Sequence, residues 1–121
     1  MPIIDVHLVL APQSAETKGL TKRLADILGQ LFRAEPGRVW VRLHILPAEH
    51  YAENQTTVAP PDLPVFATVL HARPPKGQAR EEEALAITRA IAECLNRPPS
   101  RVHVEYAAKG AGRVAFGGKL L

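Results

Sequence analysis

The chain of 121 residues repeats itself, and this internal repeat limits its possible folds more than any other feature. Six residues of the first half recur in the second half at one constant offset: Leu24, Leu28, Pro36, Arg38, Val39 and Val41 match Ile87, Ile91, Pro99, Arg101, Val102 and Val104. Pro2 and Pro64 open the two halves at nearly the same offset. The pattern predicts a single domain over 1–121, built from repeats at about 2–46 and 64–107 and a C-terminal tail at 108–121.

The first half is typical of a strand, a helix and a second strand. Residues 3–10 and 38–46 have the composition and alternation of strands. The apolar face of the intervening helix has helical spacing: Leu20, Leu24, Ile27, Leu28 and Leu31. Ser14 is suited to cap this helix, and Pro36-Gly37 ends it. In the strand at 38–46, one face carries Val39, Val41, Leu43 and Ile45 and the other carries Trp40, Arg42 and His44.

The second half follows the same plan. Residues 65–72 and 101–107 are predicted strands, and the helix between them opens at Glu81-Glu82-Glu83, which suit a helix N-terminus. Its inner face is predicted to consist of Ala84, Ile87, Ile91, Cys94 and Leu95, and Pro98-Pro99 ends it. The link at 47–63 is long for a small domain, which is typical of a site wall or lid.

Two β-α-β units with right-handed crossovers predict an α/β (α+β) fold: a four-stranded mixed sheet with both helices on one face. The other face has no cover in this chain. Strands 3–10 and 65–72 are apolar in both alternation phases, as in strands buried on two sides. An uncovered apolar face predicts a partner surface, so we expect an oligomer in which sheets pack together.

Composition excludes several classes of protein. The formal net charge is +3 and the basic residues are scattered, which suits small anionic ligands as well as nucleic acid. The single Cys94 excludes an intramolecular disulfide and fits a reducing compartment, so we expect a cytoplasmic protein. No stretch is long enough for a membrane span, and the N-terminal run does not resemble a signal peptide. The five histidines show no ligand spacing, so no metal site is expected.

Pro2 is the main candidate for chemistry. Methionine is normally removed before a small second residue, which would leave Pro2 as a free secondary amine at the start of a buried strand. An α-amino group has an ordinary pKa of about 7.7–8.0, and burial lowers it toward the range useful for a general base. The alternative is a proline that merely leads a strand, where its missing N–H costs little.

The ends and the repeat together resemble the tautomerase superfamily. The start Pro2-Ile3-Ile4 matches, and the ending 108–118 resembles the 4-oxalocrotonate tautomerase tail, "AKG" followed by "GG". The length and the Val114-x-Phe116 spacing resemble macrophage migration inhibitory factor. This resemblance implies a homotrimer whose sheets form a central barrel. It also implies keto–enol tautomerisation of a small anionic 2-oxo acid or enol, with Pro2 as base and with no metal or organic cofactor.

The residues that would hold the substrate depart from the family pattern. One family arginine follows the first strand, where this chain has Pro12 or Gln13, and another lies where it has Trp40, with His103 at the matching place in the other half. Arg73 is the best replacement, because its position resembles the paired-arginine region of the cis-3-chloroacrylic acid dehalogenase branch. That branch carries an acidic residue where this chain has Ala115, so dehalogenation by water addition is not expected.

Four further residues are candidates for the site. Lys109 would steer anions, and Phe116 would line the pocket mouth near Pro2. Arg42 would reach the pocket or an ion pair between subunits, with the interface favoured. His103 lies where the migration inhibitory factor pattern places a tyrosine supplied by the adjacent subunit. For Arg73 and Lys109 the alternative is a solvated charge, and for Phe116 it is plain packing. For His103 the alternative is a polar pair with Glu105 at the interface.

Two other functions remain open from the sequence. The missing arginines also fit a catalytically silent trimer that acts as a binding or structural protein. A ferredoxin-like module for RNA has the same order of strands and helices, but it would need several aromatic residues on the open sheet face. Trp40 alone qualifies, so neither nucleic acid nor a membrane is the expected partner.

Overall fold

A computed structural model describes residues 1–12 and 17–121 of the chain. Ser14, the predicted helix cap, and Gln13, one of the two residues at the position of a family arginine, lie outside the described residues. The main elements are β1 (Ile3–Leu10), α1 (Leu20–Leu31), β2 (Trp40–Pro47), β3 (Val65–Leu70), α2 (Gln78–Leu95) and β4 (Val102–Tyr106). A small hairpin of β5 (Ala115–Phe116) and β6 (Lys119–Leu120) follows.

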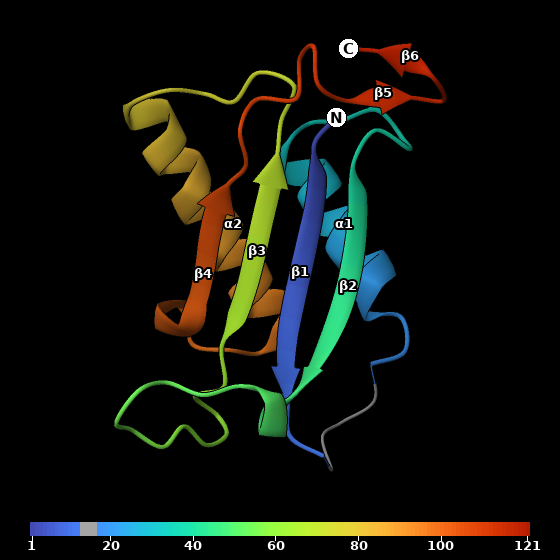
Figure 1. Cartoon of the computed structure of the whole chain (residues 1–121). Coiled ribbons are helices and arrows are strands. Elements are labelled where there is room, and N and C mark those ends of the chain that lie inside the picture. Colours follow the sequence, from blue (N-terminus) through green and yellow to red (C-terminus); the bar gives the residue numbers. More distant parts are fainter. Residues whose placement is uncertain (13–16) are drawn as a thin grey trace.

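The large strands form one mixed sheet in the order β2-β1-β3-β4. Strand β1 runs parallel to β2, β3 runs parallel to β4, and the two central strands β1 and β3 are antiparallel. Both helices cover the same face of this sheet (Figure 1). The predicted arrangement of two β-α-β units is therefore confirmed.

The two halves share one strand register. Ile3 lies opposite Trp40 in the first half, and Phe66 lies opposite His103 in the second. Phe66 follows Ile3, and His103 follows Trp40, by the same number of residues by which Arg101 follows Arg38. By this register the counterpart of Pro2 is Val65. Pro64, which opens the second half, lies one position before the register counterpart of Pro2.

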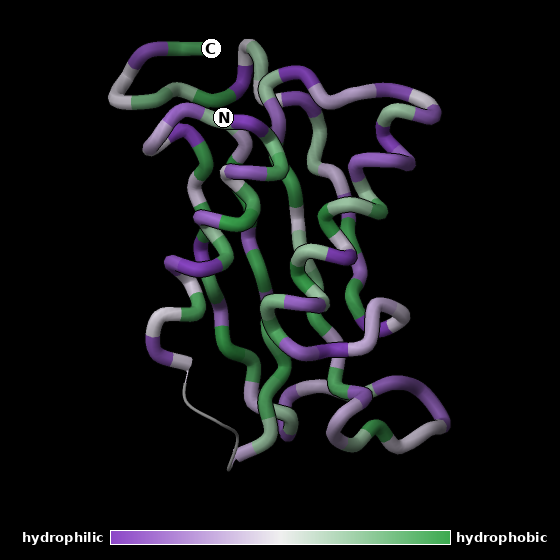
Figure 2. Tube along the Cα trace, turned by 180° about the vertical axis from the view of Figure 1, so that it is seen from behind, coloured by the Kyte–Doolittle hydropathy of each residue, from purple (hydrophilic) through white to green (hydrophobic). Residues whose placement is uncertain are grey.

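The core lies between the sheet and the helices, and the repeat marks its centre. The side chains at two matched pairs of helix positions are fully buried: Leu24 and Leu28 in α1, and Ile87 and Ile91 in α2. They pack on the inward residues of the central strands: Ile4, Val6, Leu8, Val65, Ala67 and Val69. Viewed from the helix side, Figure 2 shows hydrophilic and hydrophobic stretches alternating along the helices, as expected for amphipathic helices on a sheet.

Several element boundaries differ from the predicted ones. Helix α2 begins at Gln78, so only Glu81 of the acidic run lies in its first turn. It ends at Leu95, because Asn96 adopts a left-handed conformation (φ 53°) two residues before the proline pair. Ile45 lies opposite the inward residue Leu8, on the face predicted for it, but it is 45% exposed because it lies near the end of an edge strand.

The face of the sheet without helices is mixed, so the prediction of a continuous apolar face is wrong. Side chains alternate along a strand, and the inward residues of β1 and β3 leave Asp5, His7 and Thr68 on the outer face. These lie beside Arg42 of β2 and Glu105 of β4.

In the described part of the chain, neither helix is long and apolar enough to cross a membrane.

Candidate functional site

The N-terminus is fixed at one end of the sheet. Pro2 is buried, and its carbonyl oxygen accepts a hydrogen bond from the Trp40 backbone N–H at 3.1 Å. The next residue, Ile3, lies between Trp40 of β2 and Leu70 of β3. Because β1 is a central strand, both of its neighbours hold this end in place.

A cavity of about 440 Å³ opens beside the N-terminus. The residues that line it are Met1, Arg38, Trp40, Phe116, Lys119, Leu120 and Leu121. Strand β2 supplies Trp40, and the tail hairpin supplies Phe116, whose ring stacks on the indole with centroids 4.6 Å apart. The hairpin (Figure 1) therefore brings the C-terminal end of the chain over the N-terminus.

The electrostatics of this cavity favour a neutral amine and an anionic ligand. Burial, together with the positive charge of Arg38, lowers the pKa of the Met1 amine below its ordinary value. Among the described residues, neither Arg38 nor Lys119 has a carboxylate within 4.0 Å. The cavity thus combines two unpaired cations with an aromatic and aliphatic wall.

Several solved structures share this fold. A Q0 fused 4-OT symmetric trimer aligns with a TM-score of 0.75 at 18% identity, over 98% of this chain and 94% of the other. The macrophage migration inhibitory factor of Trichinella spiralis aligns with a TM-score of 0.73 at 12% identity, over 98% of this chain and 99% of the other. This chain has the fold of fused 4-OT and of macrophage migration inhibitory factor.

A third structure with this fold is Pt0534 inactivated by 2-oxo-3-pentynoate, with a TM-score of 0.75 at 19% identity over 98% of this chain and 94% of the other. No protein-family model matches the chain, and no curated protein matches it by sequence. At these identities the likeness concerns the fold.

A second cavity, of about 510 Å³, lies at the same end of the sheet between β4 and the start of α2. Four cationic residues line it: Arg73, Lys76, Arg80 and Lys109. The Arg80 Nε donates to the Pro75 carbonyl at 2.7 Å, and the guanidinium lies over the ring of Tyr106, 5.5 Å from its centroid. Two predicted site residues, Arg73 and Lys109, are therefore together, but they do not line the cavity beside the N-terminus.

A network of hydrogen bonds holds Tyr106, one of the residues that line this second cavity. Glu83 of α2 accepts from the Tyr106 hydroxyl at 2.6 Å, and its same oxygen lies 2.9 Å from Nε2 of His71. Burial and the bond to Glu83 raise the pKa of Tyr106. The network connects the ends of β3 and β4 to the first turns of α2.

The turn at Gly110 separates the two cavities. Its N–H donates to the His71 carbonyl at 2.7 Å. A Cβ at this position would lie 3.3 Å from the same oxygen and 3.3 Å from Cε of Met1. The Met1 side chain therefore packs against this turn, and only a residue without a side chain fits there undisturbed.

Of the other two predicted site residues, Arg42 lines a hollow of about 570 Å³ together with Ile3, Trp40 and Phe116. His103 lies on β4, opposite Phe66. Arg42 donates two hydrogen bonds to Asp5, at 2.6 and 2.7 Å. This ion pair is within the chain, whereas the sequence interpretation favoured a pair between subunits. His103 is exposed, with its ring 5.2 Å from that of Phe66.

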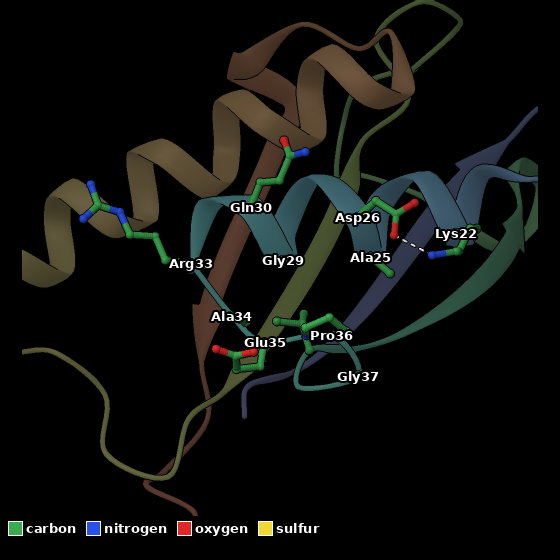
Figure 3. Close-up of a pocket in the computed structure, with 11 residues that line it drawn as sticks. Lys22, Ala25, Asp26, Gly29, Gln30, Arg33, Ala34, Glu35, Pro36 and Gly37 are labelled. Carbon is green, nitrogen blue, oxygen red and sulfur yellow. Dashed lines mark hydrogen bonds and ion pairs between the residues drawn. The ribbon is translucent and has the colours of Figure 1, made fainter.

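A further hollow, of about 580 Å³, lies on the helix side (Figure 3). It lies between α1 and the turn that leads to β2, and an ion pair of 2.6 Å between Lys22 and Asp26 borders it. None of the predicted site residues lines this hollow. Nor does the described part of the chain contain a group of three or more His, Cys, Asp or Glu placed to hold a metal ion.

The sequence interpretation missed four cationic residues that the fold brings to these cavities. Arg38 and Lys119 lie beside the N-terminus, and Lys76 and Arg80 line the second cavity. Arg38 did carry a signal, because it is one of the repeated positions. Lys119 carried none, since its place depends on how the tail folds back.

Proposed function

We propose that this protein is a cofactor-independent tautomerase in which Pro2, once Met1 has been removed, is the general base. The observation that carries the proposal is the position of Pro2. It is buried at the start of β1, directly behind a residue that lines a cationic cavity, in a protein with the tautomerase fold. Removal of Met1 would turn the Pro2 amide into a secondary amine facing that cavity.

The proposed reaction moves one proton. The neutral Pro2 amine takes a proton from the enol hydroxyl of a small 2-oxo acid, or from the carbon beside its carbonyl. It then returns a proton at the other atom, so the net change is keto–enol isomerisation. The burial and the Arg38 charge that lower the pKa of the Met1 amine support a neutral amine at this terminus. A cation beside the developing enolate stabilises its negative charge.

We further propose a homotrimer. Two fused 4-OT structures with this fold are trimers, one symmetric and one asymmetric, and this supports the same assembly here. In such a trimer we assign Arg42 and His103 to the surfaces between subunits. Phe116 is proposed to form a wall of the substrate pocket, and Arg73 and Lys109 to attract small anions toward this end of the sheet.

The alternative is a catalytically silent trimer with a binding or structural role. One observation favours it: Trp40 stands where the family pattern has a substrate-binding arginine, and its indole stacks on Phe116. If Met1 is retained, the nitrogen of Pro2 is an amide and has no basic lone pair. The two functions therefore differ in the state of one peptide bond.

The proposed function is tested by the ketonisation of phenylenolpyruvate, followed by ultraviolet absorbance, in protein whose intact mass shows that Met1 is absent. We expect a rate above background that Pro2→Ala abolishes. Pro99→Ala is the matched control, since Pro99 is exposed and lies at the opposite end of the sheet from Pro2. An unchanged rate in folded Pro2→Ala would reject the proposal, and no rate in the trimmed wild-type protein would favour the silent trimer.

A further inference from the structure

The internal repeat provides a second copy of the N-terminal cavity's framework. Arg38 precedes Trp40 by two residues, and Arg101 precedes His103 by two residues. Trp40 and His103 have equivalent partners in the sheet, namely Ile3 and Phe66. The two arginines thus lie at equivalent places, at opposite ends of the sheet because the two halves run antiparallel.

In the second half, this place is occupied by a carboxylate of the chain itself. Glu53, from the linker after β2, forms an ion pair with Nη2 of Arg101. The same Glu53 oxygen accepts a hydrogen bond from the Tyr51 hydroxyl, and the Tyr51 ring lies 6.0 Å from that of Phe66. An internal segment therefore places a carboxylate on the arginine and an aromatic ring beside it.

In the first half, the covering segment offers no such carboxylate. The tail hairpin lies over the equivalent place, but it contributes Phe116 and Lys119. Arg38 is exposed and has no carboxylate within 4.0 Å among the described residues. What remains is the cavity of about 440 Å³, with its aromatic pair of Trp40 and Phe116.

We propose that Arg38 is the carboxylate-binding residue of the N-terminal cavity, and that its ligand is a monocarboxylate with a planar apolar body that packs on Trp40 and Phe116. The Glu53–Arg101 pair is the internal model for this contact. Lys119 adds a second positive charge, while Leu120 and Leu121 add an apolar lining. A guanidinium binds a carboxylate through two parallel hydrogen bonds, so arginine is better suited than lysine to orient it.

This inference deepens the proposed function, because it names the substrate class and the residue that holds it. It also revises the assignment made from the sequence, where Arg73 was the leading clamp. Arg73 lies in the other cavity, beyond the turn at Gly110. A substrate seated on Arg38 would have its reacting carbons near Pro2, because Arg38 and Met1 line the same space.

The chain offers a direct probe of binding that does not depend on activity. Trp40 is the only tryptophan, so a ligand in this cavity should change the tryptophan fluorescence. We would titrate trimmed protein with 3-phenylpropanoate and with its neutral analogue 3-phenylpropanamide. The proposal predicts saturable quenching by the acid and at least about tenfold weaker binding of the amide, the loss expected for one charge-assisted hydrogen-bonded contact.

Three variants place the contact on one residue. Arg38→Gln should weaken binding of 3-phenylpropanoate about tenfold or more, and Arg38→Lys should restore part of the loss. Arg89→Gln, which removes the same charge from an exposed position of α2, should bind within about twofold of wild type. The proposal is overturned if Arg38→Gln binds as wild type does, if Arg89→Gln loses as much, if Arg73→Gln alone weakens binding, or if the acid does not bind.

The Pro2→Ala protein separates this inference from the proposed function. In the Pro2→Ala background, Arg38→Gln should weaken binding of 3-phenylpropanoate by the same factor as in wild type, because the carboxylate contact does not involve the amine. Binding that depends on Arg38 in a protein without Pro2-dependent activity would uphold the site and reject the reaction. Activity that depends on Pro2 but not on Arg38, in KM or in kcat, would uphold the reaction and reject the site.

Discussion

At the scale of single residues, the charges of this protein link strands that are neighbours in the sheet. Asp5 and Arg42 lie opposite each other in β1 and β2 and form a two-pronged ion pair. The equivalent pair in the second half, Thr68 and Glu105, is joined by a hydrogen bond of 3.0 Å. The repeat has therefore kept a polar cross-strand contact at this place while changing its chemistry.

The pair of Asp5 and Arg42 predicts a pH dependence of stability. The hydrogen bonds from Arg42 hold the pKa of Asp5 below its ordinary value. The pair therefore stabilises the fold above the pKa of the unfolded chain, near 3.9, and this stabilisation is lost as the pH falls through the lower folded value. Asp5→Asn should be less stable than wild type at pH 6, and the difference should shrink toward pH 2 in urea denaturation. A difference that grows on acidification would contradict the assignment.

A second residue, Arg97, joins three segments after the end of α2. Its guanidinium donates to the carbonyl oxygens of Leu63 at 2.5 Å and Val9 at 2.9 Å, and burial lowers its pKa. Arg97→Met should lower the free energy of unfolding by about 2–3 kcal/mol, because it leaves both carbonyls without their charged donor. Exposed Arg89→Met should change it by about 0.5 kcal/mol or less. Equal effects in urea denaturation would show that Arg97 contributes only charge.

At the scale of elements, both helices cover the sheet and bury apolar side chains at matched positions of the repeat. Leu28 in α1 and Ile91 in α2 are both fully buried against the central strands. Leu28→Ala should cost about 3 kcal/mol of unfolding free energy, from lost burial and from the cavity left behind. Leu85→Ala is the control, because Leu85 is 48% exposed on α2 and should cost far less. A similar loss in both variants would contradict the assigned core.

The elements also explain what the sequence could predict. Strands, helices and their order follow from the repeated apolar pattern, because burial against a shared core imposes that periodicity. The start of α2 was missed because Gln78 and Ala79 lack a capping signal, and Gly77 makes no side-chain cap. The polarity of the outer sheet face was underestimated, because β1 and β3 are mostly apolar and Asp5, His7 and Thr68 are the polar residues between apolar ones.

The site was less accessible from the sequence than the fold. Pro2 was found from its position in the chain, and Phe116 from the resemblance of the tail. The neighbours that matter most, Arg38 and Lys119, lie 81 positions apart in the sequence and meet only through the folding of the tail. Neither a motif nor the residue spacing predicted that Arg73 and Lys109 would line the same cavity. They come together only because β3, β4 and α2 meet there in the folded chain.

At the scale of the whole molecule, the sheet has two open edges, β2 and β4, and one face without helices. Unpaired edge strands are natural sites of association. The proposed trimer predicts a sedimentation-equilibrium mass three times the 13.2 kDa of one chain, at micromolar concentration. A monomeric mass would contradict the trimer and, with it, the assignment of Arg42 and His103 to surfaces between subunits.

The central claim is that the free amine of Pro2 is the base, and it is tested most directly by changing only the bond between Met1 and Pro2. Protein that retains Met1 would be assayed for phenylenolpyruvate ketonisation before and after treatment with methionine aminopeptidase, with intact mass recorded for both samples. The account predicts background rates before treatment and a rate that rises in proportion to the trimmed fraction. Equal rates in the two samples would contradict it, because the amide nitrogen of Pro2 cannot take up the proton.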